Sequence, residues 1–97
     1  MKTALYILAM SATVAFSQPA QAACYADYKA KIAQPLQLHY GVVKIPDNIC
    51  SNNQKIRKNI AQRISRGGWT LLNVMSVFGP EGLSQRQASA GNYYLKF

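Results

Sequence analysis

The first 22 residues constrain this chain most, because they have the pattern of a secretory signal peptide. Lys2 precedes an apolar run over residues 4–16, and the small-residue sequence Ala-Gln-Ala over residues 20–22 is typical of a signal-peptidase site. We therefore expect residues 1–22 to be removed during export from a bacterial cytoplasm. The remaining protein, residues 23–97, is then a single periplasmic or secreted domain of about 75 residues.

The two cysteines, Cys24 and Cys50, can join in an exported chain because disulfides form in oxidising compartments. A domain of this size buries only about 60% of the surface that its unfolded chain exposes, so a covalent link adds stability that the core lacks. Chain-entropy estimates give roughly 3 kcal/mol for such a loop. We therefore predict one Cys24–Cys50 disulfide. Two free thiols are the alternative, and a lipid on Cys24 is disfavoured because Gln21 stands where a lipobox has an aliphatic residue.

The chain is strongly basic. Its formal net charge is +8, and removal of Lys2 with the signal peptide lowers this to +7. Such a field attracts polyanions over long distances. Outside the cytoplasm the abundant anions are lipid phosphates and envelope polymers, so we expect an anionic envelope component rather than nucleic acid as a charged partner. No second apolar stretch approaches the roughly 20 residues of a membrane span, so we expect no transmembrane segment in the mature chain.

Hydrophobic periodicity predicts an α+β domain with three strands and one helix. Alternating apolar side chains predict strands over residues 36–45 and 69–78, and a short third strand over residues 92–97. Between the first two strands, isoleucines at intervals of four predict an amphipathic helix over residues 52–66. Residues 23–34 are compatible with a short helical turn or an ordered arm.

This order of elements predicts a βαββ fold. A right-handed crossover makes the first two strands parallel, and the C-terminal strand then inserts antiparallel between them, giving the strand order 1-3-2. The helix covers one face of the sheet, and the polar stretch over residues 83–91 is expected to be a connection. The other face then needs a cover. A second copy is the simplest one, so we predict a homodimer, with the N-terminal arm or a ligand as alternatives.

Three segments carry a family resemblance. They are Tyr40-Gly-Val-Val43, Gly68-Trp-Thr-Leu-Leu-Asn-Val74 and Tyr93-Tyr-Leu-Lys96. With them the chain resembles a family of short bacterial domains of unknown function, in which Tyr-x-Val-Val, a helix, Gly-Trp-x-Leu-x-x-Val and a terminal aromatic strand follow one another. The resemblance covers about residues 38–97 and implies a βαββ fold. It implies no activity, cofactor or catalytic residue, because none is established for the family.

Two groups of side chains are candidates for a binding surface. The predicted helix has an isoleucine stripe on one side and basic residues on the opposite side, which are Lys55, Lys58, Arg63 and Arg66. A face of this kind is also the ordinary solvated side of a helix. Tyr40 and Tyr94 lie on predicted strands, from which their rings can line a smaller surface on the helix-free side of the sheet.

The sequence offers little for catalysis. His39 is the single histidine, expected to be an ordinary surface or partly buried residue, and the three acidic residues lie in separate segments, so no acid–base pair is evident. The cysteines lack C-x-x-C spacing, and one histidine cannot supply a zinc site. We therefore predict no enzyme, no metal and no cofactor. The leading prediction is a noncatalytic exported binding or assembly module of unknown partner. The alternative is a cationic envelope-active factor that binds anionic lipid or polymer through the basic helix face.

Overall fold

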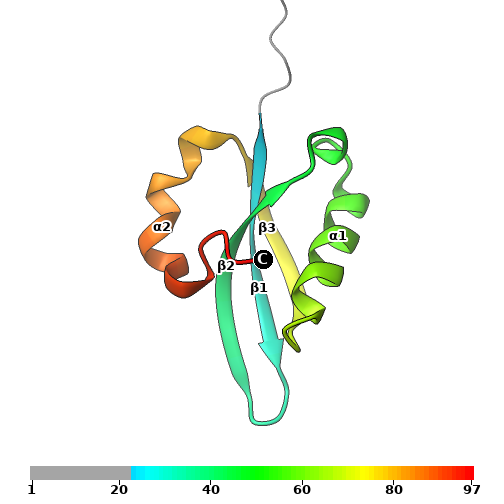
Figure 1. Ribbon diagram of the computed structural model, residues 1–97, viewed down its shortest axis with the longest axis vertical. Helices are drawn as coiled ribbons and strands as arrows, with labels where there is room; N and C mark the ends of the chain where they lie inside the picture. Colours follow the sequence, from blue (N-terminus) through cyan, green and yellow to red (C-terminus); the bar gives the residue numbers. More distant parts are fainter. Residues whose placement is uncertain (1–22) are drawn as a thin grey trace, which may run out of the picture.

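The computed structural model describes residues 23–97, so the predicted signal peptide lies outside the described residues. Three strands and two helices follow one another in the order ββαβα (Figure 1). They are β1 (Cys24–Ile32), β2 (Gln37–Ile45), α1 (Asn53–Ser65), β3 (Thr70–Phe78) and α2 (Ser84–Ala90), with 3₁₀ turns at Asp47–Ile49, Pro80–Gly82 and Gly91–Tyr93.

The predicted fold class is confirmed, since this is an α+β domain with a three-stranded sheet and a Cys24–Cys50 disulfide. The sheet has the order β2-β1-β3, and β1 pairs antiparallel with both neighbours. β2 and β3 are therefore parallel to each other, and the chain passes from one to the other through α1. The disulfide joins the start of β1 to the turn before α1, with the two Cα atoms 6.1 Å apart.

The prediction was wrong about which segment forms the central strand. β1 lies in the centre of the sheet in place of residues 92–97, so the fold is ββαβα rather than βαββ. In β1, Ala26, Tyr28 and Ala30 alternate with polar residues and are fully buried in one core with the isoleucines of α1. This alternation has the period of a strand rather than that of a helical turn.

Residues 92–97 form no strand. Gly91 and Leu95 have positive φ angles, of 54° and 56°, which turn the backbone out of an extended path. The segment instead crosses the outer edge of β2, where Tyr94 makes one bridge to Val42 and the Leu95 amide donates to the Val42 carbonyl at 2.8 Å. The C-terminal segment therefore closes this edge of the sheet.

α1 agrees with the predicted helix to within one residue at each end. The side chain of Asn52 caps its start by accepting a hydrogen bond from the Lys55 amide at 3.0 Å. Gly68, with a φ angle of +86°, provides the left-handed turn that follows its end. Three isoleucines are buried against the sheet, namely Ile56, Ile60 and Ile64. Each buried side chain of this size contributes about 1.5–3 kcal/mol, which holds the helix on the sheet.

The core between the sheet and α1 is built around Tyr28, the largest fully buried side chain among the described residues. Its ring passes over Gly41 of β2, where a Cβ atom would lie only 2.5 Å from the Tyr28 hydroxyl oxygen. Glycine at this position therefore lets the ring approach the strand closely. Trp69, which follows the helix stop, is buried in the same core.

The second face of the sheet is covered in part, which corrects the expectation of a single helix. The polar stretch predicted as a connection contains α2, which packs on β2 on the side opposite to α1 (Figure 1). Val42, on this face, is fully buried. The half of the face away from α2 stays open, and Leu38 and Leu72 are exposed there.

Candidate binding site along the free edge of the sheet

β3 is the free edge of the sheet. One side of this nine-residue strand pairs with β1, and no described strand pairs with its other side. The backbone register against β1 shifts at Leu72 and at Met75, which leaves these two side chains without a partner on β1 and exposed to solvent. An unpaired edge presents amide and carbonyl groups that another extended chain can bind.

A groove runs between this edge and α1. Two hollows with volumes of about 400 and 330 Å³ form it. The residues along the first include Arg57, Lys58, Ala61, Trp69, Thr70 and Leu71, and those along the second are Asn53, Arg57, Val74, Met75, Ser76 and Val77. Arg57 lines both hollows and therefore lies between them. The groove is mainly apolar along β3 and basic along α1.

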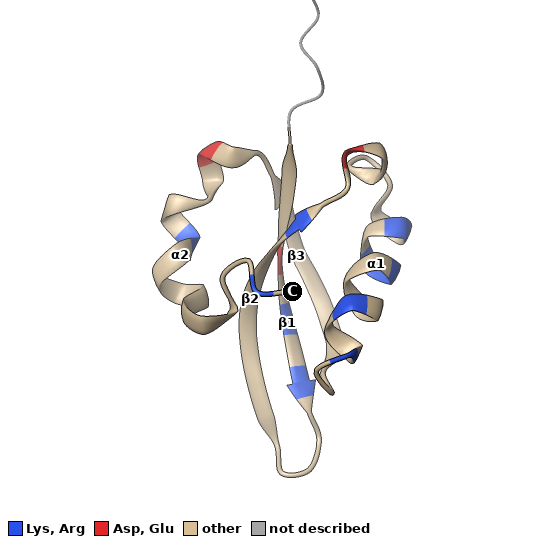
Figure 2. Cartoon of the chain, in the orientation of Figure 1, with Lys and Arg blue, Asp and Glu red and all other residues tan. Residues whose placement is uncertain are grey.

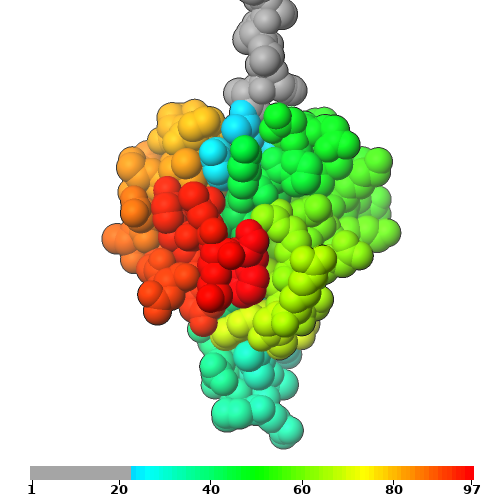
Figure 3. Space-filling model, in the orientation of Figure 1, coloured from blue at the N-terminus to red at the C-terminus, as the bar shows by residue number. Residues whose placement is uncertain are grey.

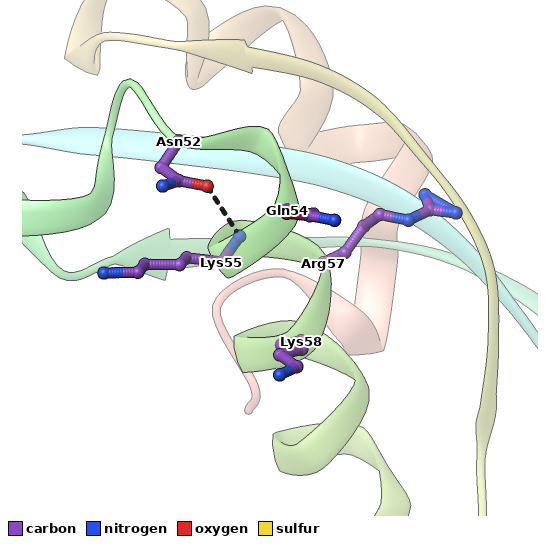
Figure 4. Close-up of a pocket in the computed structure, with 5 residues that line it drawn as sticks. All are labelled: Asn52, Gln54, Lys55, Arg57 and Lys58. Carbon is purple, nitrogen blue, oxygen red and sulfur yellow. Dashed lines mark hydrogen bonds between the residues drawn. The ribbon is translucent and has the colours of Figure 1, made fainter.

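Basic residues occur in both halves of α1, and most of the exposed ones lie in its first half (Figure 2). The exposed cations of α1 are Lys55, Arg57 and Lys58, followed by Arg66 just after its end, and α1 contains no acidic residue. Near the start of the helix a further hollow is lined by Asn52, Gln54, Lys55, Arg57 and Lys58 (Figure 4). There the side chains of Lys55 and Arg57 point to opposite sides of the helix, and that of Arg57 extends toward β3. The cations therefore form a broad surface rather than a pocket around one small ion.

The structure separates Arg63 from the other three predicted basic residues, which are exposed. Arg63 lies on the opposite flank of α1, where its guanidinium group donates to the Lys44 carbonyl and to the Phe97 carbonyl, both at 2.8 Å. Burial lowers the pKa of Arg63. Arg63 therefore ties α1 to β2 and to the C-terminal segment and does not belong to the free basic face.

Arg57 was missing from the predicted set. The helical period places it beside Ile64, at the margin of the apolar stripe, so the sequence pattern alone gives it no place on the basic face. The structure shows that this margin lies beside an edge strand, where a long side chain reaches solvent through the groove. Only the strand order reveals this, since the same position beside a central strand would be covered.

The two predicted tyrosines have separate partners. Tyr94 lies on the C-terminal segment at the β2 edge, whereas the Tyr40 hydroxyl donates to Asp27 Oδ2 at 2.7 Å. Asp27 also accepts from the Ser76 hydroxyl at 2.6 Å and from Arg86 Nε at 3.0 Å. This buried carboxylate therefore connects all three strands to α2.

The charge of Asp27 is stabilised by these contacts. Burial by itself raises the pKa of Asp27, but hydrogen bonds from Ser76, Tyr40 and Arg86 outweigh burial and leave the pKa below its usual value. Burial and the neighbouring carboxylate raise the pKa of Tyr40 to about 12. Because both carboxylate oxygens are occupied, the cluster holds α2 on the sheet and offers no free acid or base.

His39 is buried, which corrects the expectation of a surface or partly buried residue. Its ring stacks on Tyr93 with centroids 3.7 Å apart and meets Trp69 edge-on at 4.2 Å. Its Nε2 atom shares a hydrogen bond of 2.8 Å with the Tyr28 hydroxyl, and Nδ1 has no partner within the described part of the chain. Burial lowers the pKa of His39 to about 4, so the ring is neutral at neutral pH.

Within residues 23–97, no group of three or more His, Cys, Asp or Glu side chains is placed to hold a metal ion. No helix in the same range is both long and apolar enough to cross a membrane. What the groove itself offers is unpaired backbone, positive charge and apolar side chains. These features suit the binding of another chain.

Comparison with protein-family models, curated proteins and solved structures finds no match to this chain. The resemblance to short bacterial domains therefore stays a prediction.

Proposed function

We propose that this chain is an exported, noncatalytic binding module that takes up an extended, acidic segment of a partner protein along the free edge of β3. The observation that carries the proposal is an unpaired nine-residue strand beside a basic helix, with a groove between them. An incoming strand pairs its backbone with β3, and its alternate side chains enter the groove. The backbone supplies affinity, and the groove supplies specificity.

The groove favours acidic and apolar side chains in the incoming segment. Val74, Met75 and Val77 supply apolar contacts from β3, while Arg57 and Lys58 on α1 supply charge-assisted hydrogen bonds to carboxylates. No acidic side chain lines either hollow among the described residues. Ten Lys or Arg and three acidic residues in the same range give a net charge of +7, which attracts an acidic partner from a distance.

The homodimer predicted from the sequence remains a second way to use the same edge. Its first reason was an uncovered sheet face, and α2 now covers part of that face. Two β3 strands can still pair antiparallel and extend the sheet. That arrangement brings Arg57 of one copy toward Arg57 of the other and joins two chains of net charge +7. Like charges oppose this contact, so we favour an acidic segment over a second copy.

The exposed cations also support one other function, a cationic envelope-active factor. Lys55, Lys58 and Arg66 would engage anionic lipid or polymer through charge alone. This function needs no free strand. It therefore predicts binding that weakens steeply with salt and is insensitive to changes in β3.

The test uses the processed chain and two synthetic peptides of the same length as β3. One peptide alternates Glu with Val and Thr, and the other has Lys in place of each Glu. Isothermal titration calorimetry measures both affinities at the same salt concentration. We expect the Glu peptide to bind at least about tenfold more tightly, because the groove wall is cationic.

Two arginine substitutions separate groove binding from general attraction. Arg57→Glu should weaken binding of the Glu peptide at least about tenfold, which corresponds to about 1.4 kcal/mol. Arg66→Glu makes the same charge change on an exposed residue outside the groove and should cost less than about threefold. Equal losses would favour the cationic envelope-active factor. Failure of the unmodified chain to bind the Glu peptide would contradict the proposal. Sedimentation of the chain alone would then show whether it forms a homodimer instead.

A further inference from the structure

The far end of the β1–β2 hairpin extends beyond the rest of the fold. Figures 1 and 3 show this end projecting past both helices and β3. Its two leucines, Leu36 and Leu38, are 67% and 64% exposed, more than any other large apolar side chain of the described residues. Both leucines are therefore exposed to solvent, and no other part of the described chain covers them.

Positive charge lies beside and behind these leucines. Lys31 pairs with Leu38 across the two strands and Lys29 pairs with Tyr40, so both lysines share a sheet face with Leu38. At a rise of about 3.3 Å per residue, Lys29 lies about 10 Å from the end of β1. No acidic residue occurs over residues 28–46. The blue segments near this end of β1 in Figure 2 mark the same charge.

The same face continues into a shallow, mainly apolar hollow of about 270 Å³, lined by Lys29, Leu38, Tyr40 and Leu72 among others. α2 leaves this half of the face open, and Leu72 is exposed in it. Together Leu36, Leu38, Leu72 and the two lysines form one continuous area, the hairpin surface. It is apolar at its centre and cationic behind its tip.

We propose that the hairpin surface docks on an anionic lipid bilayer. Leu36 and Leu38 enter the boundary between headgroups and acyl chains, where interfacial segments lie about 5–10 Å deep. Lys29 is set back along β1 by a comparable distance, which places it at the level of the lipid phosphates. Lys31 is level with Leu38, and its long side chain can carry the ammonium group back toward the same phosphates. This match of depth and charge favours a lipid surface over an apolar pocket in a protein, which would need the leucines alone.

The docking does not rest on the function proposed for β3, because the hairpin surface shares Leu72 with β3 but no residue with the groove. A chain held at a membrane by the hairpin leaves the free edge of β3 available. Binding of lipid and binding of a peptide can therefore succeed or fail separately. The two proposals are distinguished by their variants.

The test measures partition of the processed chain into vesicles of phosphatidylcholine with and without phosphatidylglycerol. We expect binding that requires phosphatidylglycerol. Leu36→Ser combined with Leu38→Ser should lower the partition coefficient at least about tenfold, since two side chains lose their apolar surroundings. The control combines Met75→Ser with Leu95→Ser, which removes two exposed apolar side chains elsewhere and should change partition less than about twofold.

A second pair of variants locates the charge. Lys29→Gln combined with Lys31→Gln should weaken partition by about fivefold for each lysine at low salt. Lys55→Gln combined with Lys58→Gln, on α1, makes the same change in net charge and should weaken it less. Circular dichroism of every variant confirms that the fold is kept.

Three results would overturn the proposal. Partition that survives loss of both leucines would show that the hairpin does not enter the lipid. A larger loss from the α1 pair than from the β1 pair would assign lipid binding to the basic helix face. Absence of vesicle binding by the unmodified chain would contradict lipid docking and would favour an apolar pocket of a protein partner as the binding site of the leucines.

Discussion

Acid should destabilise this protein through His39 before Asp27 contributes. The pKa of His39 falls from its ordinary 6.5 to about 4 because the ring is buried among aromatic side chains. In the unfolded chain the ring regains its ordinary pKa and takes up a proton below about pH 6.5. As pH falls from 6.5 to 4, the unfolded state therefore binds a proton that the folded state does not, and stability is lost over that window.

The two pKa values set the size of the effect. Between pH 7 and pH 5 the free energy of unfolding should fall by about 2 kcal/mol, and the loss should level off below pH 4. Asp27 does not contribute in this range, because its lowered pKa keeps the carboxylate ionised and its stabilisation is lost only at lower pH. Because the side chain of His39 is almost fully buried, solvent screens little of this cost.

Urea unfolding followed by the fluorescence of Trp69 measures the effect at a series of pH values. His39→Gln is the informative variant, since Gln retains a hydrogen-bonding group for Tyr28 but does not titrate. Its absolute stability will be lower, but the slope between pH 7 and pH 5 should be nearly flat. Equal slopes in the variant and the unmodified chain would refute the reasoning.

Two further changes test the fold. Replacing Cys24 and Cys50 with Ser should lower the free energy of unfolding by roughly 2–4 kcal/mol while the far-ultraviolet circular dichroism spectrum is kept. Mass spectrometry of the exported chain should show that it begins one residue before Cys24 and that its mass is about 2 Da below that of the fully reduced chain. An unchanged melting temperature would show that the bridge adds nothing. Gly41→Ala should cost about 1–3 kcal/mol, because the new methyl group meets the Tyr28 ring. A neutral result in thermal unfolding would mean that the ring has room to move.

The sequence predicted the parts of the fold that carry strong periodicity. Isoleucines at intervals of four identified α1, and alternating apolar and β-branched residues identified β2 and β3. The right-handed crossover through the helix correctly predicted that these two strands are parallel. β1 was missed because its buried positions include Ala26 and Ala30, which are weak strand formers, and because the spacing of its residues is also compatible with a short helical turn or an ordered arm. Both alanines are nevertheless fully buried in the same core cluster as Tyr28 and the isoleucines of α1.

The candidate site was less predictable than the fold. A basic helix face was predicted, but its boundary was not, because the sequence does not tell which flank of α1 meets the C-terminal segment and which meets an edge strand. That difference makes Arg63 a structural residue and places Arg57 in the groove. The hairpin leucines were counted as part of an ordinary strand, because their exposure depends on how far the hairpin extends beyond the helices.

Hydrogen exchange along β3 tests the central claim most directly, because strand addition must protect backbone amides. In the free chain, those β3 amides that point away from β1 should exchange rapidly. In the presence of saturating Glu peptide the same amides should become protected, while the amides of α2 and of the β1–β2 hairpin are unchanged. Peptide binding without new protection in β3, or with protection confined to the exposed face of α1, would contradict strand addition.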